Sequence, residues 1–365
     1  MQNFIRTFLI CLVMSMLLLI ACPKVRAEVV EPTGRDTTVT ESFDKSAPPS
    51  QVSIWKDESG GYNTSNPSLW GRNYWVCLSS TDPQNGECRT SGSWANTGET
   101  TIPLIFKEKR SGITTTINVK GSHHFGAYGP YQIYGATYYT NMPETKATFY
   151  ISQTELSKFP VGGIWQAELK VNLMQWDPYI VLGNWNAHIT LKVSDNNNQQ
   201  IYLPAFGTAD PHVDLNLRPL PGTKANQTML SGTATLDMCL YDGYNSNSSE
   251  FVISPKDDYN GLPGREFGLF SVYHNGQIDT ANRIDYQLQI LDLLSRKFIE
   301  LDNWQNYVAT KISEAPLRSV HLPGIPQAVA CVPTALRFVT PDFTLTSKTA
   351  GRYTGTLHLK LTTQM

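Results

Sequence analysis

Charged side chains are scarce in this sequence. Asp, Glu, Lys and Arg supply 16% of its 365 residues, against about 25% in ordinary soluble domains. Together with 41% hydrophobic and 11% aromatic residues, this excludes a disordered, highly charged chain. Helix formers such as Ala, Glu and Lys are few, whereas Thr, Tyr, Val, Asn and Gly are common. The composition therefore predicts an all-β protein, and the length predicts more than one domain.

A long apolar run occurs at one place only, at residues 8–22, with the sequence FLICLVMSMLLLIAC. Arg6 precedes it, and Val25 and Ala27 follow in the spacing of a signal-peptidase site. The pattern predicts a secretory signal, residues 1–27, cleaved before Glu28. A membrane anchor is one alternative, but the run is shorter than the roughly 20 residues that span a bilayer. Lipidation of Cys22 is another, because the preceding residues resemble a bacterial lipobox.

No basic excess is present. Without residues 1–27 the chain keeps 26 basic and 31 acidic side chains, a net charge of −5 that divides into about −3 for residues 28–206 and −2 for residues 207–365. Proteins that bind nucleic acid carry basic faces that neutralise phosphates. We therefore expect no nucleic-acid partner.

Cysteine is sparse after the signal, where Cys77, Cys88, Cys239 and Cys331 remain. An even number in an exported chain favours disulfides, and four cysteines allow three pairings. Cys77 and Cys88 bracket a turn-rich stretch, so a local loop is the simplest pairing, and Cys239 with Cys331 would then staple the second half. Zinc is the alternative, but the sequence has no C-x-x-C and a single pair of adjacent histidines. We expect no metal and no cofactor.

Motifs that carry catalysis are also missing. The sequence has no G-x-S-x-G, H-E-x-x-H, phosphate-binding loop or dinucleotide fingerprint. Asp257 and Asp258 form a carboxylate pair on a turn-like stretch, where we expect both to be solvated. Glycosidase carboxylates need proximity in space only, so a secreted carbohydrate-active enzyme remains an alternative, but we expect no enzyme.

Short alternating segments are abundant. Residues 165–173 (WQAELKVNL) and 213–217 (VDLNL) alternate apolar and polar side chains, which is typical of strands with one buried face. Further strand-like runs occur at 102–108, 114–120, 147–152, 189–193 and 284–299, and turn-forming clusters separate them. The pattern predicts two β-sandwiches, preceded by a loose polar leader at residues 28–50.

The boundary between the two halves is expected at residues 204–211. A strand over 200–203 ends at Pro204, a segment of linker composition follows, and a new strand begins at Val213. We therefore expect an N-terminal domain of residues 28–206 and a C-terminal domain of residues 207–365.

The chain ends on an alternating segment. Tyr353, Leu357, Leu359 and Leu361 fall on one face of it. A free edge strand exposes unpaired backbone groups, and one solution is a strand donated by another chain. An ordinary terminal strand that is paired on both sides explains the pattern equally well.

Five blocks of sequence carry a resemblance. They are R-x-x-x-VCLSS at 72–80, EKRS at 108–111, GGIW-x-A-x-LK-x-N at 162–172, VDLNLRP at 213–219 and MCLYDGY-x-x-NSS at 238–249. In this order, they resemble the tip adhesins of class 5 fimbriae, the CblD-type initiators of pilus biogenesis in the alternate chaperone–usher pathway. The similarity covers essentially all of the chain after the signal.

The resemblance implies two immunoglobulin-like sandwiches, an adhesin domain and a pilin domain that lacks its last strand. A periplasmic chaperone would occupy the open groove first, and the N-terminal extension of the major pilin would replace it. Passage through the outer-membrane usher would place the protein at the fimbrial tip on the cell surface. The cysteine pairs of the family fall on Cys77–Cys88 and Cys239–Cys331.

The resemblance also implies a receptor site at the distal end of the adhesin domain, where relatives carry a basic cluster. Arg72 matches one of its arginines, but Gln175 and Trp176 stand where two others are expected. A tryptophan and an amide suit a sugar, so we expect a host-cell glycan or glycoprotein as receptor. Lys109 and Arg110 also match the family. Solvated or structural roles for these side chains are the alternatives, as is an initiator that binds no receptor.

Overall fold

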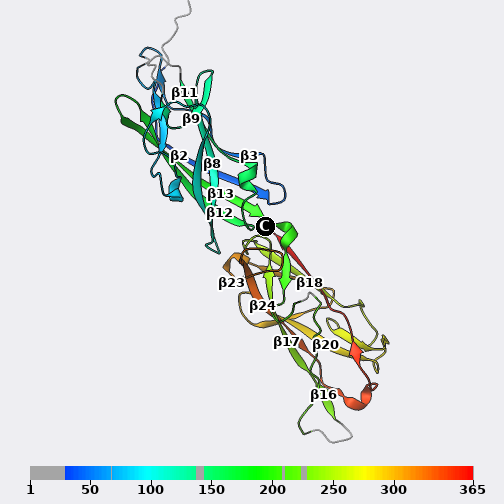
Figure 1. Cartoon of the computed structure of the whole chain (residues 1–365). Coiled ribbons are helices and arrows are strands. Elements are labelled where there is room, and N and C mark those ends of the chain that lie inside the picture. The colour runs from blue at the N-terminus through cyan, green and yellow to red at the C-terminus, as the bar shows by residue number, and fades with distance from the viewer. Residues whose placement is uncertain (1–28, 67, 137–143, 208–209, 223–227, 365) are drawn as a thin grey trace, which may run out of the picture.

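The computed structural model describes residues 29–364 except 67, 137–143, 208–209 and 223–227, so the expected signal peptide lies outside the described residues. Two β domains stack end to end in a long molecule, with the C-terminus at the junction between them (Figure 1). The all-β prediction and the division into two domains are confirmed. No helix in the described residues combines the length and apolar character of a membrane span.

The first domain is built around one large antiparallel sheet with a single parallel edge. Its main strands run in the order β2-β13-β12-β7-β8-β11-β3, with β5 paired to β12 and β9 to β8. The elements are β1 (Val29–Val30), β2 (Arg35–Asp44), β3 (Gln51–Ser59), β4 (Tyr62–Asn63), β5 (Asn73–Cys77), η1 (Pro83–Asn85), β6 (Ser93–Trp94), β7 (Thr100–Glu108), β8 (Thr114–Phe125), β9 (Tyr128–Gln132), β10 (Gly135–Ala136), β11 (Thr145–Ser152), α2 (Gln153–Leu156), β12 (Gly163–Gln175), β13 (Ile180–Ser194) and η2 (Asn196–Asn198).

Three tryptophans show how this sheet closes on itself. Trp55 lies on β3 at one end of the strand order and Trp185 on β13 near the other, yet their ring centroids are 5.3 Å apart. Trp75 of β5 completes the cluster, 5.2 Å from Trp185. All three are buried. The alternation of β12 and its neighbours places their apolar side chains on this inner face, as the sequence predicts.

The polar leader is part of the fold. The expectation of a loose segment at residues 28–50 is wrong, because β2 pairs in parallel with β13 over ten residues, from Arg35 to Asp44. Val39 and Phe43 pack against the core while most of the polar side chains face outward. A strand with so few apolar residues lacks the sequence signal of a buried strand but still satisfies its backbone through the sheet.

The second domain contains a six-strand path in the order β14-β17-β24-β20-β19-β26 and two three-stranded sheets, β22-β18-β27 and β15-β16-β25. The elements are β14 (Gln200–Tyr202), β15 (Arg218–Pro219), β16 (Met229–Ser231), β17 (Thr233–Tyr241), β18 (Glu250–Lys256), β19 (Phe270–His274), β20 (Arg283–Leu291), β21 (Phe298–Leu301), β22 (Tyr307–Thr310), η4 (Ile312–Glu314), β23 (Arg318–Val320), β24 (Val329–Val339), β25 (Phe343–Thr344), η5 (Leu345–Ser347), β26 (Tyr353–Thr354) and β27 (His358–Gln364).

Two segments near the expected boundary differ from the sequence analysis. Residues 200–202, which we assigned to the end of the first domain, form β14 and pair with β17 of the second. Residues 213–217 are not a strand in the structure, although Val213 and Leu215 still pack against the second core. Alternation therefore reports correctly which side chains face inward there, but not that the backbone is paired.

The two disulfides, Cys77–Cys88 and Cys239–Cys331, are formed as predicted. The first closes a loop at the end of β5, and the second joins β17 to β24.

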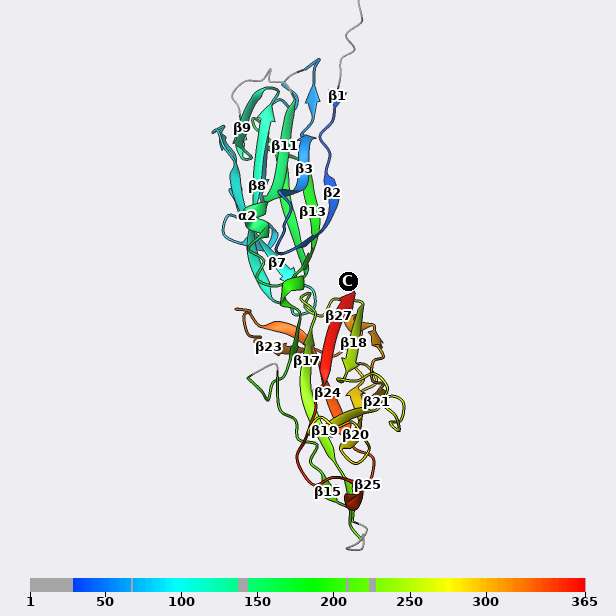
Figure 2. The same ribbon diagram turned by 90° about the vertical axis from the view of Figure 1, so that its right-hand side faces the viewer.

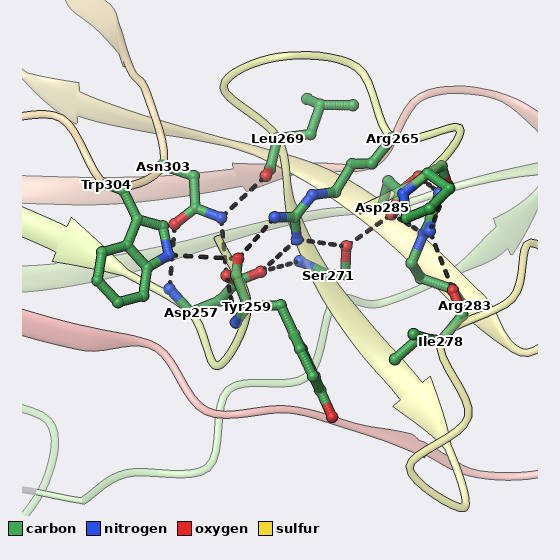
Figure 3. Close-up of polar contacts among 11 residues, drawn as sticks. Asp257, Tyr259, Arg265, Leu269, Ser271, Ile278, Arg283, Asp285, Asn303 and Trp304 are labelled. Atoms are coloured by element: carbon green, nitrogen blue, oxygen red, sulfur yellow. Dashed lines mark hydrogen bonds and ion pairs between the residues drawn. The ribbon is translucent and has the colours of Figure 1, made fainter. Parts of the chain in front are cut away.

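The carboxylate pair at residues 257–258 is not solvated as a pair. The Asp257 side chain is buried and ion-paired with Arg265 at 2.6 Å, and it also accepts a 2.8 Å hydrogen bond from Asn303 (Figure 3). Backbone N–H groups of Tyr259 and Ser271 donate to the same carboxylate. Asp258 alone is exposed. The buried acid therefore holds loops together, and its oxygens are fully engaged.

Candidate functional site

Arg72 stands at the end of the first domain that lies away from the junction, directly before β5. Its backbone carbonyl accepts a hydrogen bond from the Trp176 N–H, which ties it to the hairpin between β12 and β13. Its guanidinium lies 3.4 Å from the carboxylate of Asp177, whose side chain is 77% exposed against 16% for Arg72. The carboxylate, not the guanidinium, is therefore the outer charge at this position.

Trp176 lies between two exposed aromatic rings. The Trp94 centroid is 5.8 Å from it with a 40° tilt, and the Tyr179 centroid is 5.1 Å away with a 58° tilt. Trp94 is 58% exposed and Tyr179 65% exposed. We call Trp94, Trp176 and Tyr179 the aromatic platform. Exposed aromatics gathered on one surface mark binding sites more often than single exposed rings do.

A small satellite core supports the platform from below. It contains buried Tyr74, Val76 and Ala136, against which Trp176 packs. Tyr74 meets Trp176 edge to face at 6.2 Å, and burial raises the pKa of its hydroxyl, further raised by Tyr179 and partly offset by a hydrogen bond from the Gly92 N–H. A Cβ at Gly92 would lie 2.8 Å from the Tyr74 ring and 3.1 Å from Trp176. Only glycine fits beneath these rings.

Gln175 does not belong to this surface. It is 6% exposed, because it continues the inward-facing series of Leu169, Val171 and Leu173 along β12. A side chain in that position cannot offer its amide to a receptor. The expectation that Gln175 binds a sugar is therefore withdrawn.

Arg110 lies at the opposite end of the domain, inside the junction. Its guanidinium donates to the carbonyl of Ser246, to that of Ile312 at 3.0 Å and to that of Ala315 at 2.9 Å, all in the second domain. Burial lowers its pKa, and the nearby carboxylates of Asp242 and Glu108 oppose that shift. Arg110 thus fastens the two domains together, and the geometry contradicts its assignment to the receptor site.

Lys109 is next to Arg110 but exposed. It lines an open, largely polar depression of about 490 Å³ over β7, β12 and β13, together with Lys107, Glu168 and His188. Trp165 of β12 pairs with Glu108, and Gln175 ends the same strand. Ten residues of strand span about 34 Å, so Lys109 and Arg110 cannot share one binding surface with Arg72 and Trp176.

Buried Glu108 organises the junction. Its two oxygens accept hydrogen bonds from the backbone of Arg110, Ser111 and Ile164, and from the side chain of Asn247 in the second domain. The apolar core of the first domain continues across the junction to Tyr241 and the Cys239–Cys331 disulfide. Two of the sequence blocks, 108–111 and 238–249, therefore meet here and serve the contact between domains.

Two glycines allow the close approach. Gly243 has φ +70°, and a Cβ there would lie 2.2 Å from the Asp195 carbonyl. A Cβ on Gly162 would overlap the carbonyl of Gly243. Both positions need the smallest residue because backbone meets backbone.

The four residues expected at the edge of an open groove lie along the end of the chain. Leu357, Leu359 and Leu361 are partly buried and pack against the second core. Tyr353 lies instead on β26, which pairs with β19, and its hydroxyl donates to backbone carbonyls of Ala281 and Thr349. β27 pairs with β18 along its whole length, and no second strand pairs with it among the described residues (Figure 2).

Sequence reasoning missed Trp94 and Tyr179. Tyr179 is three residues after Trp176 in a Trp-Asp-Pro-Tyr turn, a position where an aromatic ring is exposed by default. Trp94 carries no comparable signal, since a contact between β6 and the β12–β13 hairpin depends on the fold. In the described part of the chain, no group of three His, Cys, Asp or Glu side chains is placed to hold a metal ion.

Comparison with known proteins gives the family. Residues 24–196 match the first domain, and residues 199–365 the second domain, of the CFA/I fimbrial protein CfaE. The chain is 32% identical over 317 residues to the CFA/I fimbrial protein of this kind from Escherichia coli, an alignment that covers 82% of each chain.

Solved structures agree. The crystal structure of CfaE, the adhesive subunit of CFA/I fimbria of enterotoxigenic Escherichia coli, has a TM-score of 0.80 at 29% identity, over 92% of this chain and 94% of that one. A CFA/I chaperone–tip adhesin complex gives a TM-score of 0.66 at 29% identity, over 93% and 98% of the two chains. The chain belongs to the CfaE family, the tip adhesins of class 5 chaperone–usher fimbriae.

Proposed function

We propose that this protein initiates a fimbrium and stays at its tip, that its second domain accepts a strand donated by the major pilin, and that its first domain binds a host-cell glycoconjugate through the distal aromatic platform. Export through the periplasm, with a chaperone and then the usher as partners, brings it to the cell surface. The relatives are fimbrial adhesin subunits, not enzymes, and no catalytic role is part of the proposal.

The free edge of β27 is the observation that carries the assembly role. Leu357, Leu359 and Leu361 alternate along it, each partly buried against the second core. Val213 and Leu215, from the segment without regular pairing, pack against the same core. An added strand would satisfy the backbone of β27 and cover these side chains, which is the pattern of β-augmentation.

The N-terminal strand supports a place at the end of a fibre. A subunit inside the fibre needs a free extension to donate to its neighbour. Here residues 35–44 are held in the sheet of their own domain by β13, so this segment is not available for donation.

A peptide experiment tests strand acceptance. The probe is a synthetic peptide of the major pilin N-terminal extension, added to the mature chain, with a peptide of the same composition but without apolar alternation as control. We expect the first peptide alone to raise the melting temperature, because it buries apolar surface and pairs an open edge. Equal melting temperatures with and without it would refute strand donation.

The aromatic platform supports the adhesive role, since three rings gather at the end of the molecule farthest from the assembly edge. The test compares binding of the peptide-completed chain to epithelial cells with that of Trp176→Ala and Tyr179→Ala. Trp304→Ala is the matched control, because Trp304 is an exposed tryptophan in the second domain (41%). Loss of binding in the first two variants only is the expected result. If the intact chain binds no cells, the protein is an initiator without adhesive function.

A further inference from the structure

The charge at the aromatic platform points to the class of glycan. Arg72 is tied to the platform through the Trp176 N–H, and its guanidinium faces Asp177 at 3.4 Å. The Asp177 carboxylate projects into solvent beside Trp176 and Tyr179. Arg89, another arginine at this end, stacks on Tyr134 beside the satellite core at 5.3 Å. A ligand that reaches the rings therefore meets a negative charge first.

The shape of the platform favours sugar rings. Its three aromatic planes are tilted by 40° and 58°, so they offer separate faces in place of one flat plane. The C–H face of a hexose can stack on each ring, and a carboxylate accepts hydrogen bonds from hydroxyl groups. Carboxylate-bearing sugars would instead place like charges together, which discriminates against them.

We propose that the platform binds unsubstituted hexose residues of an uncharged glycan and that Asp177 disfavours glycans that end in an acidic sugar. This inference rests on the adhesive function proposed above and specifies its ligand. Trp94, Trp176 and Tyr179 supply the stacking faces, Asp177 accepts from ring hydroxyls, and Arg72 holds Asp177 in place.

The experiment measures binding of the peptide-completed mature chain to matched pairs of immobilised oligosaccharides, galactose-terminated and with a terminal sialic acid added. The neutral member of a pair is expected to bind about tenfold or more tightly than its sialylated partner, a difference typical of one placed charge. Trp176→Ala and Tyr179→Ala should each weaken neutral binding by about tenfold, and Trp304→Ala should not. Asp177→Asn should reduce the preference for the neutral member to about threefold or less.

Three results would overturn the inference. They are sialylated glycans bound as well as neutral ones, neutral binding that survives both Trp176→Ala and Tyr179→Ala, and binding to phosphatidylcholine vesicles that carry no glycan at the affinity of the neutral oligosaccharides. Tyr179 is mostly exposed, so its variant tests the platform even where loss of Trp176 disturbs the satellite core. Cell binding that depends on the platform without any glycan binding would refute the ligand class and leave adhesion standing; absence of cell binding would refute adhesion itself.

Discussion

The bond between Arg110 and the second domain can be tested by removing it. In Arg110→Ala the carbonyls of Ser246 and Ala315 lose their charged donor, whereas the Ile312 carbonyl keeps a hydrogen bond from the Ala315 N–H. A hydrogen bond to a charged group contributes about 1.5–3 kcal/mol, and an unsatisfied buried acceptor costs about 1–3 kcal/mol. With some relief from water entering the partly buried site, we expect a loss of about 3 kcal/mol in the free energy that closes the junction.

Amide hydrogen exchange measures this quantity locally. A loss of about 3 kcal/mol corresponds to about two orders of magnitude in opening, so amides of residues 244–249 and 312–315 should exchange about a hundredfold faster in Arg110→Ala. The β12–β13 pairing at the distal end should be unaffected, because it is about 34 Å away.

Lys109→Ala is the matched control. It removes the same charge from the neighbouring position, but the Lys109 side chain is exposed and its loss should change stability by less than about 0.5 kcal/mol. Arg110→Lys should fall between the two, since one ammonium cannot serve three carbonyls at once. Equal exchange rates in Arg110→Ala and Lys109→Ala would mean that Arg110 does not fasten the junction.

Three other predictions concern separate parts of the molecule. Gly92→Val should displace Trp176 and weaken cell binding by about tenfold or more, whereas Gly207→Val, whose Cβ would meet no atom within 4 Å, should bind normally. Loss of the Cys239–Cys331 bond should cost about 4–5 kcal/mol and loss of the Cys77–Cys88 bond about 3 kcal/mol, because the sequence separations are 92 and 11 residues; guanidinium denaturation of the two double Cys→Ser variants would contradict this if the order were reversed. For Asp44, burial disfavours the charged form, but hydrogen bonds from Ser46, Ser194 and Asn196 prevail and lower its pKa to about 2. Its ionised form therefore stabilises the fold above pH 4, and that contribution is lost as the pH falls from about 4 to 2; after allowance for solvent exposure, Asp44→Asn should remove about 1 kcal/mol of the acid-induced loss seen by urea denaturation, and an unchanged pH profile would argue against it.

Strands with one apolar face could be predicted from the sequence. The segments expected at 102–108, 114–120, 147–152, 165–173 and 189–193 fall within β7, β8, β11, β12 and β13. The strand expected within residues 284–299 corresponds to β20, Arg283–Leu291. In each case the inward series is apolar, so burial and period agree.

Errors arose where burial and pairing separate. The leader has only a few apolar residues, so its local pattern does not predict a strand, whereas β13 supplies a partner for its backbone. Residues 213–217 have the alternation but no partner strand in the structure. Pairing depends on a neighbour elsewhere in the sequence, which a local pattern does not contain.

The candidate site was partly predictable for the same reason. Trp176 and Arg72 do lie together at the distal end, as expected. The sequence already held the signal that Gln175 points inward, because it shares the parity of Leu169, Val171 and Leu173. The position of Arg110 could not be foreseen, since its three acceptors lie 136 or more residues away along the chain.

The positions of the two chain ends have a practical consequence for labelling and immobilisation. Val29 of β1 pairs with Asn63 of β4 at the outer end of the first domain, whereas Gln364 of β27 lies at the waist of the molecule (Figure 2). A tag fused before Val29 would sit near the aromatic platform, and one fused after β27 would crowd both the junction and the open edge. A fluorophore or surface anchor is therefore better attached through a single engineered cysteine on an exposed turn of the second domain, such as the one at Asn275, so that the protein is displayed with its outer end facing the cell.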